Sequence, residues 1–162
     1  MEWNFRTAQL SDLDRVTEIE YICFPAEQAA TRAAFEQRIK TFPSHFILLE
    51  HEGTPIGFVN GAVLNARYIE DEMYERTDSH NERGAYQSVY GLDVLPEYRG
   101  RGLAHKLMAQ LIDQAKKEGR RGVTLTCLDE KIGFYETMGF KNEGVSASSH
   151  GGVVWNNMIL EF

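Results

Sequence analysis

The chain has 162 residues, of which 43% are hydrophobic and 25% charged, and its formal net charge at pH 7 is −7. This balance is that of a globular protein, and the length predicts one domain, residues 1–162, with a buried core. An acidic surface argues against non-specific binding to nucleic acid or to anionic membranes and favours cationic small molecules as partners.

Periodicity in the apolar residues predicts an alternation of strands and helices. Runs typical of strands lie at 3–8, 46–49, 56–59, 86–95, 123–127, 140–148 and 152–161. A first helix, capped by Ser11 and Asp12, carries apolar positions at Leu13, Val16, Ile19 and Ile22. Two further helices are expected at 29–40 and 103–118.

Residues 66–85 interrupt this pattern with a polar, acid-rich segment. A loop of this length in a compact domain is usually functional or disordered. Its acidic residues either attract a cationic amine or form a solvated charge run, and they are Glu70, Asp71, Glu72, Glu75 and Asp78.

The stretch 92–104 joins a strand to a helix through a glycine-rich turn. The first backbone N–H groups of a helix lack intrahelical partners, and the positive end of the helix dipole points the same way. Gly100 and Gly102 allow a close approach to the backbone, and two neighbouring arginines add donors suited to phosphate. The turn therefore predicts a pyrophosphate site, with an ordinary strand–turn–helix junction as the alternative.

Two motifs carry a resemblance to a known family. Arg99-x-x-Gly102-x-Ala104 resembles the acetyl-CoA signature of the GNAT N-acetyltransferases, and residues 133–140, Gly-Phe-Tyr-Glu-Thr-Met-Gly-Phe, resemble a second GNAT signature. The resemblance covers essentially the whole chain. It implies an α/β GNAT fold, a mixed and mostly antiparallel central sheet of about seven strands with helices on both faces, and acetyl-CoA (coenzyme A) as cofactor.

The resemblance also implies which residues hold the cofactor. They lie on the strand before the turn, in the turn and in the second motif: Leu92, Asp93, Val94, Arg99, Gly100, Arg101, Gly102, Leu103, Ala104 and Phe134. The backbone amide of Val94 or Leu95 is expected to polarise the thioester carbonyl. His105, just inside the helix, packs there or contacts a CoA phosphate.

Acetyl transfer to an amine needs a base for the ammonium proton and a proton for the departing thiolate. Tyr135 matches the family tyrosine that often acts as this general acid, with packing beside the pantetheine as the alternative role. A finer resemblance, to the arylalkylamine (serotonin) N-acetyltransferase-like branch, rests on residues 23–27, the 66–85 loop and residues 125–130.

That branch bears on the identity of the base. Where its vertebrate members have two histidines, this sequence has Ser88 and Tyr90. Glu27 matches the glutamate attributed to insect relatives, so Glu27 is the predicted base, with Ser88 and Tyr90 holding water. The alternative for Glu27 is an exposed carboxylate in the first turn of the second helix.

These features predict an acetyl-CoA-dependent N-acetyltransferase for a primary amine of a small molecule, arylalkylamine-like or polyamine-like. Direct attack in a ternary complex is expected, because neither Cys23 nor Cys127 is placed as an acyl carrier. Two alternatives stay open: a protein or peptide N-acetyltransferase, and a non-catalytic acyl-CoA-binding module.

The remaining expectations concern location and partners. Two cysteines make no disulfide framework, and the N-terminus carries no signal peptide, so a cytoplasmic protein is expected. We expect no metal, nucleic-acid or membrane partner; loop histidines such as His80 and His150 are usually solvated. The terminal strands could add a contact between two copies, which leaves a homodimer open.

Overall fold

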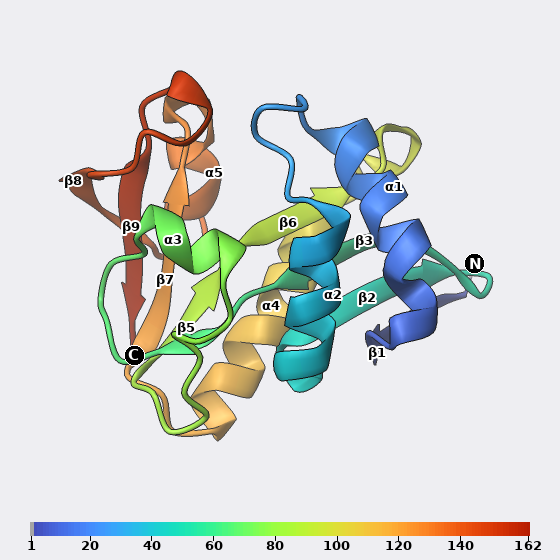
Figure 1. The fold of residues 1–162 in the computed structure, drawn as a ribbon, viewed down its shortest axis with the longest axis horizontal. Coiled ribbons are helices and arrows are strands. Elements are labelled where there is room, and N and C mark those ends of the chain that lie inside the picture. Colours follow the sequence, from blue (N-terminus) through green and yellow to red (C-terminus); the bar gives the residue numbers. More distant parts are fainter. Residues whose placement is uncertain (1) are drawn as a thin grey trace.

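The computed structural model describes residues 2–162, which form two sheets flanked by helices (Figure 1). The strands are β1 (Trp3–Thr7), β2 (Phe46–His51), β3 (Thr54–Asn60), β4 (Val63–Leu64), β5 (Tyr86–Val89), β6 (Gly91–Val94), β7 (Gly122–Cys127), β8 (Lys141–Val145) and β9 (Asn156–Glu161). The α-helices are α1 (Leu13–Cys23), α2 (Arg32–Thr41), α3 (Asp71–Glu75), α4 (Leu103–Lys117) and α5 (Ile132–Glu136).

The two sheets meet at a single interrupted strand. One sheet has the order β1-β2-β3-β6 and is antiparallel throughout; the other has the order β4-β5-β7-β9-β8, with β5 and β7 as its parallel pair. Val89 is the last residue of β5 to pair with β7, whereas Gly91 begins the pairing of β6 with β3. The chain therefore leaves one sheet and enters the other at Tyr90, and β6 diverges from β7.

The helices cover both faces of this arrangement, as the α/β GNAT prediction requires (Figure 1). The amphipathic α4 buries one stripe against β2, β3, β6 and β7, formed by Leu103, Leu107, Met108, Leu111 and Ala115. Helices α1 and α2 pack on each other, and α1 packs on β3 and β6. Burial of these apolar stripes is the main stabilising term of the fold.

The sequence predicts about seven strands, and residues 2–162 contain nine. Two differences account for this. Tyr90 divides the predicted strand 86–95 into β5 and β6, and the short β4 was not predicted. The acid-rich segment 66–85, predicted as a loop, contains the five-residue helix α3. The second helix begins at Arg32 rather than at residue 29, because the Thr31 hydroxyl caps it by accepting from the Ala34 amide at 3.1 Å.

Two details of α1 differ from the prediction. Asp12 stands at the N-cap position, but its carboxylate accepts hydrogen bonds from Arg6 and from the Gln9 amide instead of capping the helix. Ile22, expected on the buried face, is 52% exposed, whereas Glu20 is only 6% exposed. The buried stripe of α1 thus carries a carboxylate. No helix within residues 2–162 combines the length and apolar character needed to cross a bilayer.

Candidate functional site

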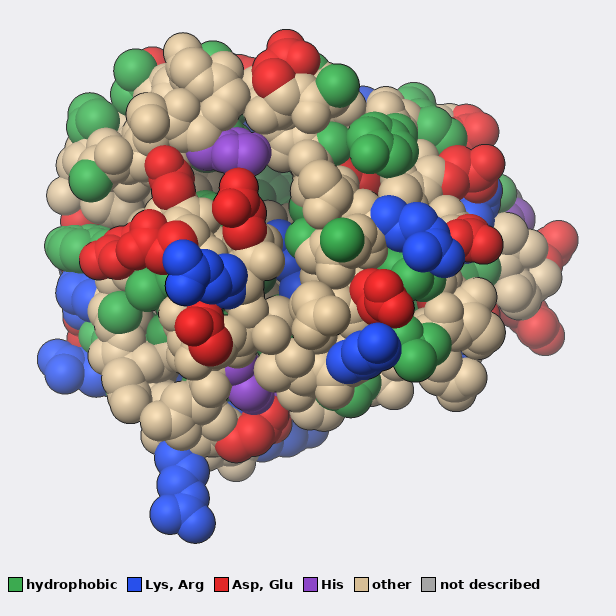
Figure 2. Space-filling model, in the orientation of Figure 1, with side chains coloured by type: hydrophobic (Ala, Val, Ile, Leu, Met, Phe, Trp, Pro, Cys, Tyr) green, Lys and Arg blue, Asp and Glu red, His purple; other side chains and the backbone are tan. Residues whose placement is uncertain are grey.

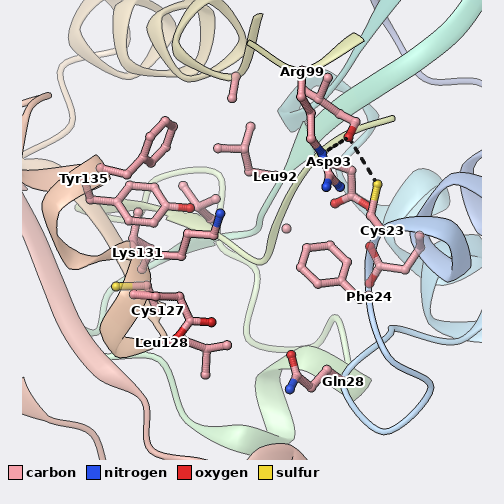
Figure 3. A pocket seen from close by; sticks show the side chains of 18 of the residues that line it. Cys23, Phe24, Gln28, Leu92, Asp93, Arg99, Cys127, Leu128, Lys131 and Tyr135 are labelled. Atoms are coloured by element: carbon pink, nitrogen blue, oxygen red, sulfur yellow. Dashed lines mark hydrogen bonds between the residues drawn. The ribbon is translucent and has the colours of Figure 1, made fainter. Parts of the chain in front are cut away.

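A cavity of about 750 Å³ lies where β6 diverges from β7. Its lining comes from the end of α1, from β5 and β6, from the start of α4, from β7 and from α5. Figure 3 shows Cys23, Phe24 and Gln28 on one side and Tyr135, Cys127 and Leu128 on the other. Sequence-distant elements are therefore brought together around one space.

The glycine-rich turn forms one end of the cavity. Gly100 and Gly102 have φ of 78° and 74°, a left-handed conformation that favours glycine, and Gly102 is the N-cap of α4. The helical hydrogen bonding of α4 begins with the Lys106 amide, which donates to the Gly102 carbonyl at 3.1 Å. The preceding amides lie at the helix N-terminus, and Leu103 and Ala104 line the cavity beside them. This geometry suits a phosphate anion.

The two arginines of the turn face different ways. Arg99 lines the cavity, and its Nε donates to the Val94 carbonyl at 3.0 Å, while Cys23 Sγ donates to the same oxygen at 3.4 Å (Figure 3). The Arg101 guanidinium lies over the Tyr98 ring, 5.7 Å from its centroid, outside the cavity lining. The Arg99 side chain thus fixes the end of β6, and its predicted contact with the cofactor stays a prediction.

Strand β6 offers backbone groups to the cavity. Leu92, Asp93 and Val94 all line it. The Leu95 amide donates to the Ile56 carbonyl at 2.9 Å, so it is not free to polarise a thioester. Because alternate residues of an antiparallel strand bond to the same neighbour, the Val94 amide faces away from β3 and toward the cavity. Of the two predicted donors, the geometry retains Val94.

Tyr135 projects from α5 with its hydroxyl toward the cavity (Figure 3). Its ring packs edge-on against two phenylalanines, and its centroid lies 5.0 Å from that of Phe134 and 5.8 Å from that of Phe140. Phe134 in turn contacts the His105 ring at 4.6 Å, which ties α5 to the start of α4. Burial raises the pKa of Tyr135. The phenol is therefore protonated at neutral pH, as a proton donor must be.

The structure separates the three residues predicted to handle the amine proton. Ser88 is fully buried, its hydroxyl donates to the Ala62 carbonyl at 2.6 Å, and it does not line the cavity. Tyr90 does line it, and burial raises the pKa of its hydroxyl to about 12. Glu27 is exposed and lies outside the lining, whereas its neighbour Gln28 is part of it.

Two carboxylates that were not among the residues predicted to accept the amine proton do line the cavity; Asp93 was predicted at the cofactor and Glu20 was not predicted at all. Glu20 of α1 and Asp93 of β6 are 6% and 1% exposed. Burial raises the pKa of Asp93 well above its ordinary range, and the nearby Glu20 raises it further. The sequence did contain a signal for Glu20. It lies four residues after Val16, so helical spacing places its carboxylate on the buried face of α1.

A second cluster of polar side chains lies apart from this cavity. His45 Nε2 and His80 Nε2 each approach Glu82 Oε1 at 2.9 Å. The Val63 amide donates to His80 Nδ1 at 3.0 Å, so the neutral His80 ring carries its proton on Nε2. His80 therefore presents a proton, not a lone pair, and the cluster is a hydrogen-bonded anchor for the loop after α3.

Comparison with known proteins agrees with the fold and the motifs. An uncharacterized N-acetyltransferase of Methanocaldococcus jannaschii is 27% identical over 153 residues, which span 88% of this chain and 62% of that protein. The L-2,4-diaminobutyric acid acetyltransferase of Vibrio parahaemolyticus is 24% identical over 94% of this chain and 74% of its own length. Among solved structures, the GphF GNAT-like decarboxylase in complex with isobutyryl-CoA has a TM-score of 0.86 at 22% identity, covering 98% of both chains.

The family comparison settles the assignment that the two motifs predicted. The family model described as the acetyltransferase (GNAT) family matches residues 13–140, which include both motifs, the helix α4 and the cavity lining apart from Trp155. Acetyl-CoA is the acyl donor of acetyltransferases of this family, and the predicted CoA-dependent acetyltransferase is confirmed at this level. The chain belongs to the acetyltransferase (GNAT) family.

Proposed function

We propose that the chain transfers the acetyl group of acetyl-CoA to a primary amine of a small molecule. The observation that carries this proposal is the divergence of β6 from β7, which opens one cavity onto both the glycine-rich turn and the carboxylates beside α1. The pyrophosphate would lie on the amides at the start of α4, and the extended pantetheine along the free edge of β6.

The reaction proposed is direct attack within a ternary complex. The neutral amine nitrogen attacks the thioester carbonyl carbon, and the Val94 amide donates to the developing oxyanion. The C–S bond then breaks, and the Tyr135 hydroxyl gives its proton to the departing thiolate. The remaining extra proton on the acylated nitrogen passes to solvent, and the Tyr135 phenolate takes a proton from solvent, which restores the phenol. The products are the N-acetylated amine and CoA.

The acceptor end favours a small, cationic and partly apolar amine. Phe24, Tyr90 and Trp155 supply aromatic lining, and acidic side chains gather over the part of the face that α3 occupies (Figures 1 and 2). His150 Nε2 donates to the Gln28 carbonyl at 3.1 Å, which joins the loop after α1 to the loop before β9 and narrows this end. Both features support an arylalkylamine-like or polyamine-like acceptor, as in the serotonin N-acetyltransferase-like branch, over an extended peptide.

An acceptor panel tests the proposal. Release of CoA thiol is followed with acetyl-CoA and tryptamine, phenethylamine, spermidine, L-2,4-diaminobutyrate or short peptides. Turnover on one of the small amines, well above that on peptides, is the expected result. Preference for a peptide N-terminus would establish the peptide alternative. Binding of CoA without turnover on any acceptor would establish a non-catalytic module.

A further inference from the structure

Five polar side chains from separate elements converge beside the cavity. They are Glu20 of α1, Arg38 of α2, Asn60 of β3, Tyr90 between β5 and β6, and Asp93 of β6. We call them the Asp93 cluster. Buried atoms without a hydrogen-bond partner among residues 2–162 occur in every member, namely Glu20 Oε1, Arg38 Nε, Asn60 Nδ2, Tyr90 Oη and both carboxylate oxygens of Asp93. Such a concentration of unpaired buried polar atoms points to a polar ligand.

Hydrogen bonds within the cluster and to the surrounding backbone hold several of its members in place. Glu20 Oε2 accepts from the Ala30 amide at 2.8 Å, which fixes Glu20, and the Glu20 carboxyl lies within hydrogen-bonding reach of the Asp93 carboxyl. Arg38 donates to Asn60 Oδ1 at 3.2 Å and to the Tyr74 carbonyl at 2.8 Å. The two terminal nitrogens of Arg38 are thus engaged by Asn60 and by the Tyr74 carbonyl, and its positive charge acts on the carboxylates without a hydrogen bond to Asp93.

The cavity gives access to Asp93 through a glycine. Gly91 lines the cavity, and a Cβ at this position would lie 3.3 Å from Asn60 Nδ2 and 3.5 Å from Asp93 Oδ1. A Cβ here would press on the Asn60 amide and lie in ordinary contact with Asp93. The two Asp93 carboxylate oxygens are themselves buried, and Gly91 leaves no side chain between them and the cavity.

We propose that Asp93 is the residue that accepts the proton of the amine substrate and that Glu20 is a positioning residue that tunes it. This inference rests on the proposed function. The acceptor binds as its ammonium ion, the N–H bond breaks, and the proton passes to an Asp93 carboxylate oxygen. The lone pair left on nitrogen then attacks the thioester, and Asp93 returns the proton to solvent after the product leaves.

The surroundings of Asp93 make it a stronger base than an ordinary aspartate. The titratable groups that act on it are Glu20 and Cys23 from α1, Arg38 from α2 and Tyr135 from α5. Burial and Glu20 raise the pKa of Asp93, whereas Arg38 lowers it. A base works best when its pKa is near the working pH. Below that pKa Asp93 is protonated and the reaction stops, so activity rises with pH through it.

Two variants of the full chain test the proposal. Asp93→Asn keeps the shape of the side chain and removes the proton acceptor, so kcat/KM falls by about 100-fold, with the CoA affinity unchanged. Glu20→Gln removes the charge that raises the pKa of Asp93, so the acid limb of the pH–rate profile moves to lower pH by about one unit. Glu18→Gln, an exposed carboxylate on the same helix, is the matched control.

The outcomes separate this inference from the function on which it rests. The role of Asp93 is overturned if the wild type turns over an amine while two results hold: the acid limb does not shift in Glu20→Gln, and the rate of Asp93→Asn is unchanged. If the large loss of rate follows Glu27→Gln instead, Glu27 is the base. Absence of wild-type turnover on every amine overturns the proposed function, and the role of Asp93 with it. If Asp93→Asn does not fold, the direction of the Glu20→Gln shift decides alone.

Discussion

The hydroxyl of Tyr135, which we propose as the proton donor for the leaving thiolate, points into the cavity from a ring packed against Phe134 and Phe140. Replacing it by Phe keeps those ring contacts. We expect Tyr135→Phe to lower kcat by about 100-fold while the Kd for CoA stays unchanged, as measured by calorimetry. A variant that retains the wild-type kcat would assign Tyr135 to packing, the alternative its position in the motif leaves open.

The buried Asp93 carboxyl also makes a prediction about stability that needs no substrate. An unfolded aspartate has a pKa of about 3.9, and the fold raises the pKa of Asp93. The folded state therefore holds the proton more tightly. The protonated Asp93 carboxyl therefore contributes stability that is fully present below the unfolded pKa, and this stability is lost as the pH rises through the folded pKa.

Denaturant titrations of the wild type and Asp93→Asn at several pH values measure this effect. As the pH rises from 4 to 8, we expect the free energy of unfolding of the wild type to decrease relative to that of the variant. Parallel curves over this range would show that the pKa of Asp93 is not raised, and would weaken its assignment as a base.

At the residue scale, the limits of the sequence are clearest on α1. The apolar spacing places Leu13, Val16 and Ile19 correctly, but it also places Ile22 inside and overlooks Glu20. The orientation of the last turn depends on what α1 meets, namely β6 and α2. Asp93 was predicted at the cofactor, and its partners Glu20 and Arg38 could not be named because they come from separate helices.

Among the elements, the turn before α4 makes a prediction about cofactor affinity. Gly102 adopts φ of 74° with no atom near its would-be Cβ, so Gly102→Ala introduces backbone strain without a clash. A left-handed alanine costs about 1–2 kcal/mol, and a turn that relaxes away from this conformation should raise the Kd for CoA by roughly tenfold.

Gly119 provides the matched control. It has φ of 77° and equally open surroundings, but it follows the C-terminal end of α4. Gly119→Ala should destabilise the chain to a similar extent and leave the Kd for CoA unaltered. An equal loss of CoA affinity in both variants would show that the effect is global rather than local to the turn.

The interruption at Tyr90 shows how much of the element pattern was accessible from the sequence. The run 86–95 predicts one strand because its composition is continuous. The structure divides it, because its first half pairs with β7 and its second half with β3. The pairing partners of a strand are distant in the sequence, so no local pattern predicts them; the motif at 99–104, which follows the second half of this run, is contiguous and was found.

For the whole molecule, a cavity between two diverging sheets predicts that the cofactor stabilises the fold. CoA bound across β6, α4 and α5 contacts only the folded chain. At a CoA concentration of about 100 times Kd the gain is about 2.7 kcal/mol, seen as a higher melting temperature. The Gly102→Ala variant should need a higher CoA concentration to reach the same rise in melting temperature. A melting temperature independent of CoA would argue against this cavity as its site.

The family and the acyl donor could be predicted from the sequence, because they depend on short contiguous motifs. The cluster that we propose on the amine side could not. That side is assembled from α1, α2, β3 and β6, whose side chains meet only in three dimensions.

The central claim is that one cavity holds the cofactor at the glycine-rich turn and the amine beside Asp93. A crystal structure with a bisubstrate analogue, CoA joined through its sulfur and an acetyl carbon to the nitrogen of tryptamine, tests it most directly. We expect the pyrophosphate on the amides that begin α4, the sulfur beside the Tyr135 hydroxyl and the amine nitrogen facing Asp93. A pyrophosphate bound elsewhere, or an amine nitrogen directed toward Glu27, would contradict it.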